Sequence, residues 1–136
     1  MKVCAQARRN KIGLGGFTMR IFIDDLREAP EGYRVARNFQ EFRKSIEEAV
    51  EGDEVVEAIS FDNDLGEGER EGYEIMKWLA ESYPQYMVGE TEITIHSANP
   101  RGRENMEAYI EFCRKHREDL LEMKSRKHPW GEMENE

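Results

Sequence analysis

The sequence predicts an α/β fold, and three observations lead to this class. Short apolar runs typical of buried strands occur at residues 21–23, 55–61 and 93–95. Segments with helical periodicity lie between and after these runs, which favours right-handed crossovers and a parallel sheet covered by helices on both faces. Each run ends in polar side chains. Because ligands of such sheets bind beyond the carboxyl ends of the strands, these ends are the predicted functional site.

The first half of the domain contains two predicted strands and one helix. The first clean strand signal begins at Met19, and residues 33–37 alternate weakly, which predicts a short second strand. Asn38, followed three residues later by a glutamate, is a helix-start signature, and Gly52 ends the helix. The apolar face predicted for this helix comprises Phe39, Phe42, Ile46, Ala49 and Val50.

The second half repeats the alternation. After the strand at residues 55–61, a second helix is predicted to stop before Pro84, because proline cannot continue a helix. Its apolar face comprises Tyr73, Met76, Leu79, Ala80 and Tyr83. The strand at residues 93–95 is predicted to be buried, and a last helix follows it. The apolar face of that helix comprises Met106, Tyr109, Ile110, Cys113, Leu120 and Leu121.

The length of 136 residues suits one domain. Residues 1–18 are predicted to form a basic, flexible extension, residues 19–121 the domain, and residues 122–136 a tail. The two cysteines, Cys4 and Cys113, are too few and too far apart for a disulfide framework, so we expect free thiols. The chain has no apolar run near the roughly 20 residues of a membrane span and no secretion signal, which predicts a soluble cytoplasmic protein without a membrane partner.

The charge distribution argues against long nucleic acids as partners. The net charge is -9, and all 29 acidic residues lie beyond residue 20. An acidic domain repels a phosphate backbone, so binding to long duplex DNA is not expected. A small anionic group can still bind at a local cluster of positive charge.

Four aspartates follow two of the predicted strands. Asp24 and Asp25 come directly after the first strand, and Asp62 and Asp64 after the strand at residues 55–61. If these strands are neighbours, the four carboxylates meet at one edge, where a divalent cation such as Mg²⁺ or Mn²⁺ relieves their repulsion. The alternative is that some of them cap turns, a common use of aspartate.

His96 follows the last predicted strand and is a candidate general acid or base. The alternative is a partly buried histidine that is hydrogen-bonded to a backbone carbonyl. Its neighbours Ser97 and Asn99 offer further hydrogen bonds, and Asn99 with Pro100 is typical of a helix start. We expect Ser97 beside His96 in the catalytic site.

Several side chains near the strand ends are candidate phosphate contacts. The helix that begins after Asn99 directs free N–H groups toward the predicted site, a geometry that favours anions. Arg101 and Arg103 add fork-shaped donors, and two further candidates are Asn99 and, after the acidic pair, Arg27. The alternative is that Arg101 and Arg103 only solvate the helix start.

Three segments together resemble a known family. Residues 21–27 (IFIDDLR), 60–66 (SFDNDLG) and 95–100 (IHSANP) are similar to the cyclic-phosphate processing receiver domains, a divergent branch of the response-regulator receiver fold. The resemblance spans residues 20–115. It implies a three-layer, flavodoxin-like fold, here with a parallel sheet reduced to about four strands and with three main helices. It also implies a role in processing cyclic phosphate ends of RNA or of nucleotides.

The receiver pattern also implies roles for the acids. Ordinary receivers hold a metal with an acidic pair after the first strand and accept a phosphoryl group on an aspartate after the third. By this resemblance Asp24 and Asp25 hold metal and Asp62 is the acceptor. The helix expected directly after Asp25 and the lysine that follows a fifth strand are both missing, which disfavours aspartyl-phosphate signalling.

The leading hypothesis is a metal-dependent phosphoesterase that acts on 2',3'-cyclic phosphates, and we expect a place in RNA repair. Asp24, Asp25 and Asp62 hold Mg²⁺ or Mn²⁺, and His96 protonates the leaving ribose oxygen. Arg101 with Ser97 stabilises developing charge. One alternative makes Asp62 a nucleophile. Others are a non-enzymatic receiver-like binding module and a small magnesium-dependent nuclease.

Overall fold

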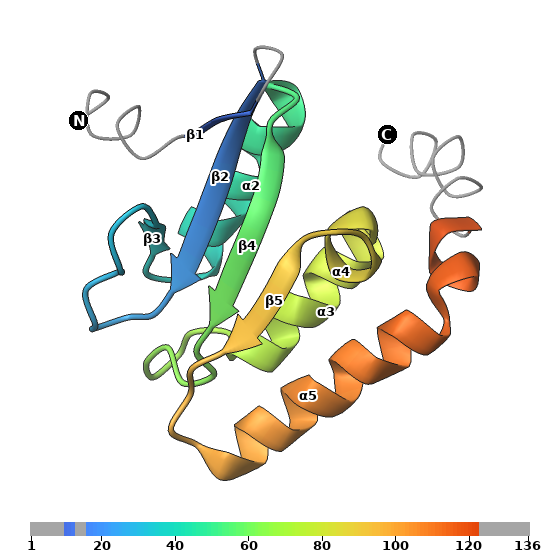
Figure 1. Cartoon of the computed structure of the whole chain (residues 1–136). Helices are drawn as coiled ribbons and strands as arrows, with labels where there is room; N and C mark the ends of the chain where they lie inside the picture. The colour runs from blue at the N-terminus through green and yellow to red at the C-terminus, as the bar shows by residue number, and fades with distance from the viewer. Residues whose placement is uncertain (1–9, 13–15, 123–136) are drawn as a thin grey trace, which may run out of the picture.

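The structure is a computed structural model that describes residues 10–12 and 16–122 (Figure 1). Its labelled strands and helices alternate along most of the chain, and residues 117–122 form a further helical segment after the last of them. The labelled elements are β1 (Asn10–Ile12), β2 (Gly16–Ile23), β3 (Arg34–Ala36), α2 (Phe39–Glu51), β4 (Val55–Phe61), α3 (Gly72–Ser82), α4 (Gln85–Val88), β5 (Glu92–Ile95) and α5 (Pro100–Lys115).

Four strands form a parallel sheet in the order β3-β2-β4-β5. β4 pairs with one edge of β2, while β1 and β3 share the other edge at residues 16–18 and 21–23. β1 is antiparallel to β2. The predicted α/β receiver-like fold, with a reduced parallel sheet and three main helices, is confirmed.

The beginning of the sheet differs from the expectation. β2 begins at Gly16 instead of Met19, and it pairs with β1 inside the segment that was predicted to be an extension. Backbone pairing at a sheet edge needs no apolar pattern, so periodicity did not reveal it. The predictions for residues 1–9, 13–15 and 123–136, including Cys4, lie outside the described residues. Cys113 is buried and free.

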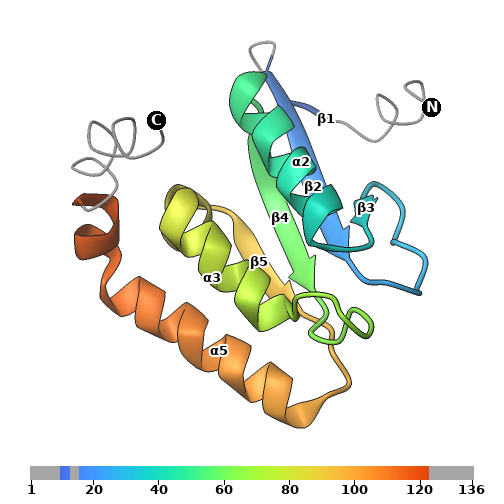
Figure 2. The same ribbon diagram turned by 180° about the vertical axis from the view of Figure 1, so that it is seen from behind.

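One face of the sheet packs against helices, and we call it the covered face. Figure 1 shows α2 and α3 behind the sheet, and Figure 2, from behind, shows them in front of it. The strand side chains on this face are Met19, Ile21, Ile23, Ile59 and Phe61, and they share a core with apolar residues of α2 and α3. Asn38 caps α2 as predicted, and its side chain accepts from the N–H of Glu41. Val50 was expected in the core but is 41% exposed, because it lies at the margin of the apolar stripe of α2.

The opposite face, which we call the open face, has no helix against it in the part of the chain that the structure describes (Figure 1). It carries Arg20, Phe22, Ala58, Ser60 and Thr94, which are paired side by side in the strand register. Helices were expected on both faces. The difference has a local cause: the segment between β2 and β3 contains proline and glycine and forms no helix.

The end of the sheet also shows a difference. β5 was predicted to be buried, but it is an edge strand among the described residues, with Ile93 and Ile95 half-buried and Thr94 exposed. α5 packs on α3, on the short helix α4 and on β5. Pro84 ends α3, as predicted, and serves as the N-cap of α4. None of the described helices combines the length and the apolar character that a membrane span requires.

Candidate functional site

Three side chains meet where the central strands end. Asp24 directly follows the last residue of β2, Asp62 that of β4 and His96 that of β5. The ladder continues through their backbones, since the N–H of Asp62 donates to Ile23 O at 3.0 Å and the N–H of His96 donates to Phe61 O at 2.9 Å. One carboxylate or imidazole atom from each of the three lies within 4.8 Å of the others. We call this group the strand-end cluster.

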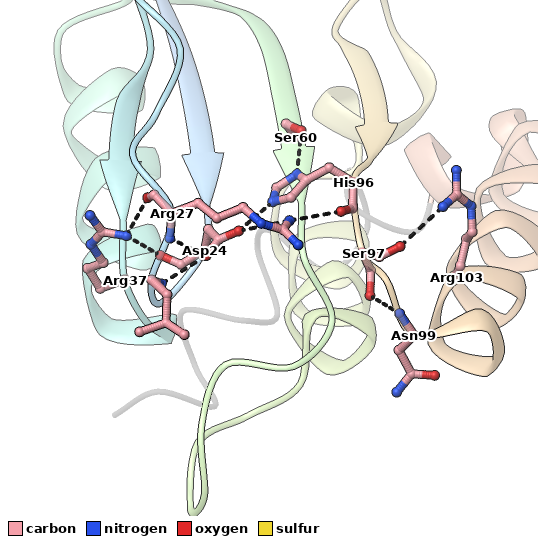
Figure 3. A network of polar contacts seen from close by, with 9 residues as sticks. Asp24, Arg27, Arg37, Ser60, His96, Ser97, Asn99 and Arg103 are labelled. Atoms are coloured by element: carbon pink, nitrogen blue, oxygen red, sulfur yellow. Dashed lines mark hydrogen bonds and ion pairs between the residues drawn. The ribbon is translucent and has the colours of Figure 1, made fainter.

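Asp24 is held by donors on both oxygens and is only 1% exposed. Oδ1 accepts from the N–H groups of Leu26 and Arg27, each at 2.8 Å. Oδ2 lies 3.0 Å from Nε2 of His96 (Figure 3). Burial on its own raises the pKa of Asp24, but the backbone donors and His96 outweigh it, and the net pKa is lowered. Asp24 is therefore a carboxylate at neutral pH.

Asp62 is in the opposite electrostatic situation. Burial raises its pKa, and the negative charge of Asp24 raises it further. The backbone of Asn63 and the side chain of Ser97 lower the pKa, but they do not compensate. Two neighbouring carboxylates with this imbalance gain from a cation, because a positive charge relieves both their repulsion and the burial of Asp62.

The imidazole of His96 is fixed on three sides and its side chain is 19% exposed. Nε2 contacts Asp24, and Nδ1 lies 2.7 Å from Oγ of Ser60 (Figure 3). The ring stacks on Phe22, with centroids 4.3 Å apart and planes 5° apart. Its ring nitrogens therefore bond side chains, and the alternative of a histidine bonded to a backbone carbonyl does not describe this site.

Asp25 and Asp64 were predicted to join the metal ligands, and the structure places both outside the strand-end cluster. Asp25 lies beside the loop glycine Gly66, where a Cβ would be 3.8 Å from its Oδ2. Asp25 lies in the bend that follows Asp24, where the alternation of the strand no longer applies. Asp64 is exposed, and its carboxylate accepts from Nδ2 of Asn99 at 3.2 and 3.3 Å.

Ser97 and Asn99 build the start of α5. The buried hydroxyl of Ser97 accepts from the N–H of Asn99 at 3.1 Å. Oδ1 of Asn99 accepts from the N–H of Gly102, also at 3.1 Å, which is the predicted N-cap. The amide of Asn99 is thus engaged by the helix and by Asp64. These contacts position the start of the helix.

The arginines lie at different distances from the cluster. Nη1 of Arg27 lies 3.4 Å from Oδ2 of Asp24 and donates to His96 O at 3.1 Å, while its side chain stays 53% exposed. Arg103 is engaged by Ser97 O at 3.1 Å and by Glu107. Arg101 is exposed in the first turn of α5. Of these three arginines, Arg27 is therefore the one that contacts the side chain of Asp24 in the strand-end cluster.

Sequence reasoning missed Ser60, which contacts His96 directly. Its position two residues before Asp62 was visible, but a serine inside an apolar strand carries no signal of its own. The role of Ser60 becomes visible once the strand order is known. Phe22, Ser60 and Thr94 are then register partners that share the open face.

The parallel order β3-β2-β4-β5, with acids at the ends of its two central strands, defines a receiver-like domain. The family model of the cyclic-phosphate processing receiver domain matches residues 19–112, so the chain belongs to this family. The predicted resemblance is confirmed. No curated protein and no solved structure matches the chain.

Proposed function

We propose that this protein is a metal-dependent phosphoesterase that opens 2',3'-cyclic phosphates. The observation that carries the proposal is the strand-end cluster, in which Asp24, Asp62 and His96 offer ligand atoms within 4.8 Å of one another. The name of the family supports a cyclic phosphate as the substrate class. A place in RNA repair and a cytoplasmic location belong to the same proposal.

The donor set fits a divalent cation such as Mg²⁺ or Mn²⁺. Asp24 and Asp62 offer the hard oxygen ligands that these ions prefer, and the raised pKa of Asp62 reflects a charge imbalance that a cation relieves. When bound, the ion supplies positive charge that polarises the phosphate and a water molecule. Asp25, predicted to be a ligand, lies outside the cluster and is not needed for this fit.

The side chains of the cluster supply the remaining chemistry. Water adds to phosphorus and gives up one proton to bulk solvent, the bond from phosphorus to one ribose oxygen breaks, and that oxygen takes the Nε2 proton of a His96 ring that also carries a proton on Nδ1. Asp24 orients the imidazole through its contact with Nε2. The exposed guanidinium of Arg27 stabilises charge on the phosphate oxygens, with Arg101 at the start of α5 as a second cation. Ser97 aligns Asp62 through its hydroxyl.

The surroundings favour a small substrate over a long strand. The loop after Asp24 carries the exposed acids Glu28 and Glu31, and the loop after Asp62 carries Glu67 and Glu69. These charges repel additional backbone phosphates. We therefore expect a cyclic mononucleotide or a short RNA end as the substrate, and this rim disfavours the alternative of a nuclease for long RNA or DNA.

The test is hydrolysis of a 2',3'-cyclic mononucleotide with Mg²⁺ or Mn²⁺ and with a chelator. Asp62→Asn and His96→Ala should each lower kcat at least about 100-fold, the usual contribution of acid-base catalysis. His116→Ala and Asp119→Asn, which remove exposed partners beyond α5, are the matched controls and should leave kcat unchanged. Chelator-resistant turnover contradicts the proposal. Absence of turnover with metal bound at the cluster supports a receiver-like binding module instead.

A further inference from the structure

Two side chains of the open face hold the imidazole of His96. Ser60 and Phe22 are register partners on β4 and β2, so they lie side by side under the ring. Oγ of Ser60 is 2.7 Å from Nδ1, and the Phe22 ring is parallel to the imidazole within 5°. Both are nearly buried, with 8% and 7% of their surface exposed. Neither is engaged in the chemistry proposed above.

The direction of the two hydrogen bonds follows from the acceptors. The Asp24 carboxylate can only accept, so Nε2 carries a proton and donates to it. In a neutral ring Nδ1 is then an acceptor, and the Ser60 hydroxyl donates to it. A hydroxyl can also accept, so Ser60 keeps its contact when Nδ1 carries a proton as well. Ser60 therefore fits both the neutral and the doubly protonated ring of His96.

The two contacts restrain different motions. Stacking on Phe22 fixes the plane of the ring. A turn of 180° about the Cβ–Cγ bond returns the ring to the same plane with its two edges exchanged, and this turn moves Nε2. Stacking does not distinguish these two orientations, and the χ2 angle of histidine is broadly distributed. The hydrogen bond to Ser60 opposes this turn, because a carbon atom would replace Nδ1 as its partner.

We propose that Ser60 is a positioning residue that keeps Nε2 of His96 directed at the two carboxylates of the strand-end cluster. The inference rests on the proposed function for its catalytic consequence. Its structural part concerns the orientation of one ring and can be measured without turnover. Ala58, on the same face, is buried as well.

The experiment compares Ser60→Ala, Ser60→Thr and Ser60→Val in the full chain. Threonine and valine have nearly the same shape, and only threonine retains a hydroxyl, so this pair separates the hydrogen bond from packing. Thr94→Ala removes a hydroxyl from the neighbouring position on β5 and is the matched control. The first readout is the nitrogen chemical shifts of the His96 ring, assigned by their loss in His96→Ala. The second is kcat and KM on a 2',3'-cyclic mononucleotide.

Alanine and valine should shift the Nδ1 resonance of His96 and lower kcat about tenfold, the equivalent of one neutral hydrogen bond, with KM within about twofold. Threonine should restore both readouts, and Thr94→Ala should change neither. If Ser60→Ala fails to fold, the threonine and valine pair decides.

Two results overturn the inference: unchanged His96 resonances in the variants without the hydroxyl, or equal behaviour of threonine and valine. Failure of the proposed function is a different result. In that case the wild type does not hydrolyse the substrate, while the loss of the Ser60 hydroxyl still shifts the Nδ1 resonance.

Discussion

The two faces of the sheet use the same strands for different purposes. On the covered face, Met19, Ile21 and Ile23 of β2 and Val56, Ile59 and Phe61 of β4 are apolar and share a core with α2 and α3. On the open face, the alternate residues include Arg20, Phe22 and Ser60, and two of these contact His96. The two faces of the strands therefore separate stability from positioning. A substitution should affect folding or the site according to which face of the sheet its side chain occupies.

The largest expected effect is on the covered face. Phe42 is 0% exposed, and its ring lies 5.9 Å from that of Phe61 and 6.1 Å from that of Trp78. Phe42→Ala should lower the free energy of unfolding by about 3–5 kcal/mol, because it leaves a cavity among aromatic rings. Guanidinium unfolding measures this change. Thr94→Ala on the open face is the comparison and should cost less than about 0.5 kcal/mol. Equal losses would remove the distinction between the faces.

A smaller effect on stability is expected at Asp62, which directly follows the last residue of β4. Its folded pKa is raised above 3.8, so between that value and the raised pKa the folded chain holds a proton that the unfolded chain has lost. Stability therefore falls as pH rises through this window. Asp62→Asn removes the penalty and should raise the Tm at pH 7 with chelator present, with no gain below the ordinary pKa of aspartate.

In chelator, Asp62→Asn is expected to be more stable than the wild type, and added Mg²⁺ or Mn²⁺ should make the wild type the more stable of the two. The ion stabilises the wild type by binding to the folded state, and Asp62→Asn should respond far less. Asp64→Asn, an exposed carboxylate outside the cluster, is the control and should respond as the wild type does. If Asp62→Asn is less stable than the wild type at pH 7 in chelator, the electrostatic description of the site is wrong.

The smallest effect concerns the ion pair of the open face. Nε of Arg20 donates to Oε1 of Glu57 at 2.7 Å, with both side chains about two-fifths exposed. A double-mutant cycle with Arg20→Ala and Glu57→Ala should give a coupling of about 0.2–1 kcal/mol. Added salt should reduce it, since exposed charges are screened. A coupling above this range that resists salt would indicate that the open face is shielded from solvent.

Much of the fold was predictable because local rules and tertiary packing agree. The cap at Asn38, the stop at Pro84 and the apolar stripes of α2 and α3 were read from spacing alone. β1 and α4 were not predicted, because each is too short to have a period. The edge position of β5 depends on which strands are its neighbours, and a single sequence does not contain that information.

The sequence predicted where the site lies, at the ends of the strands, more completely than it predicted which residues form it. Asp24, Asp62 and His96 were predicted as site residues and lie in one cluster. Asp25 and Asp64 carry the same side chain but lie outside the cluster, because Asp25 lies in a bend and Asp64 in the loop after β4, where strand periodicity no longer predicts position. Ser60 was missed because its function comes from a neighbour across two strands, in a position where serine has no chemical signature.

The register at the strand ends has a consequence for how this chain tolerates insertions and deletions. Ile23 is aligned with Phe61, and Phe61 with Ile95. Each residue of the strand-end cluster directly follows one of these three aligned residues. One residue added inside β4 would exchange its two faces and bring an apolar side chain to the place of Ser60. An addition within residues 66–69, by contrast, would leave the alignment intact. Homologues of different length should therefore vary in that loop and keep β4 constant.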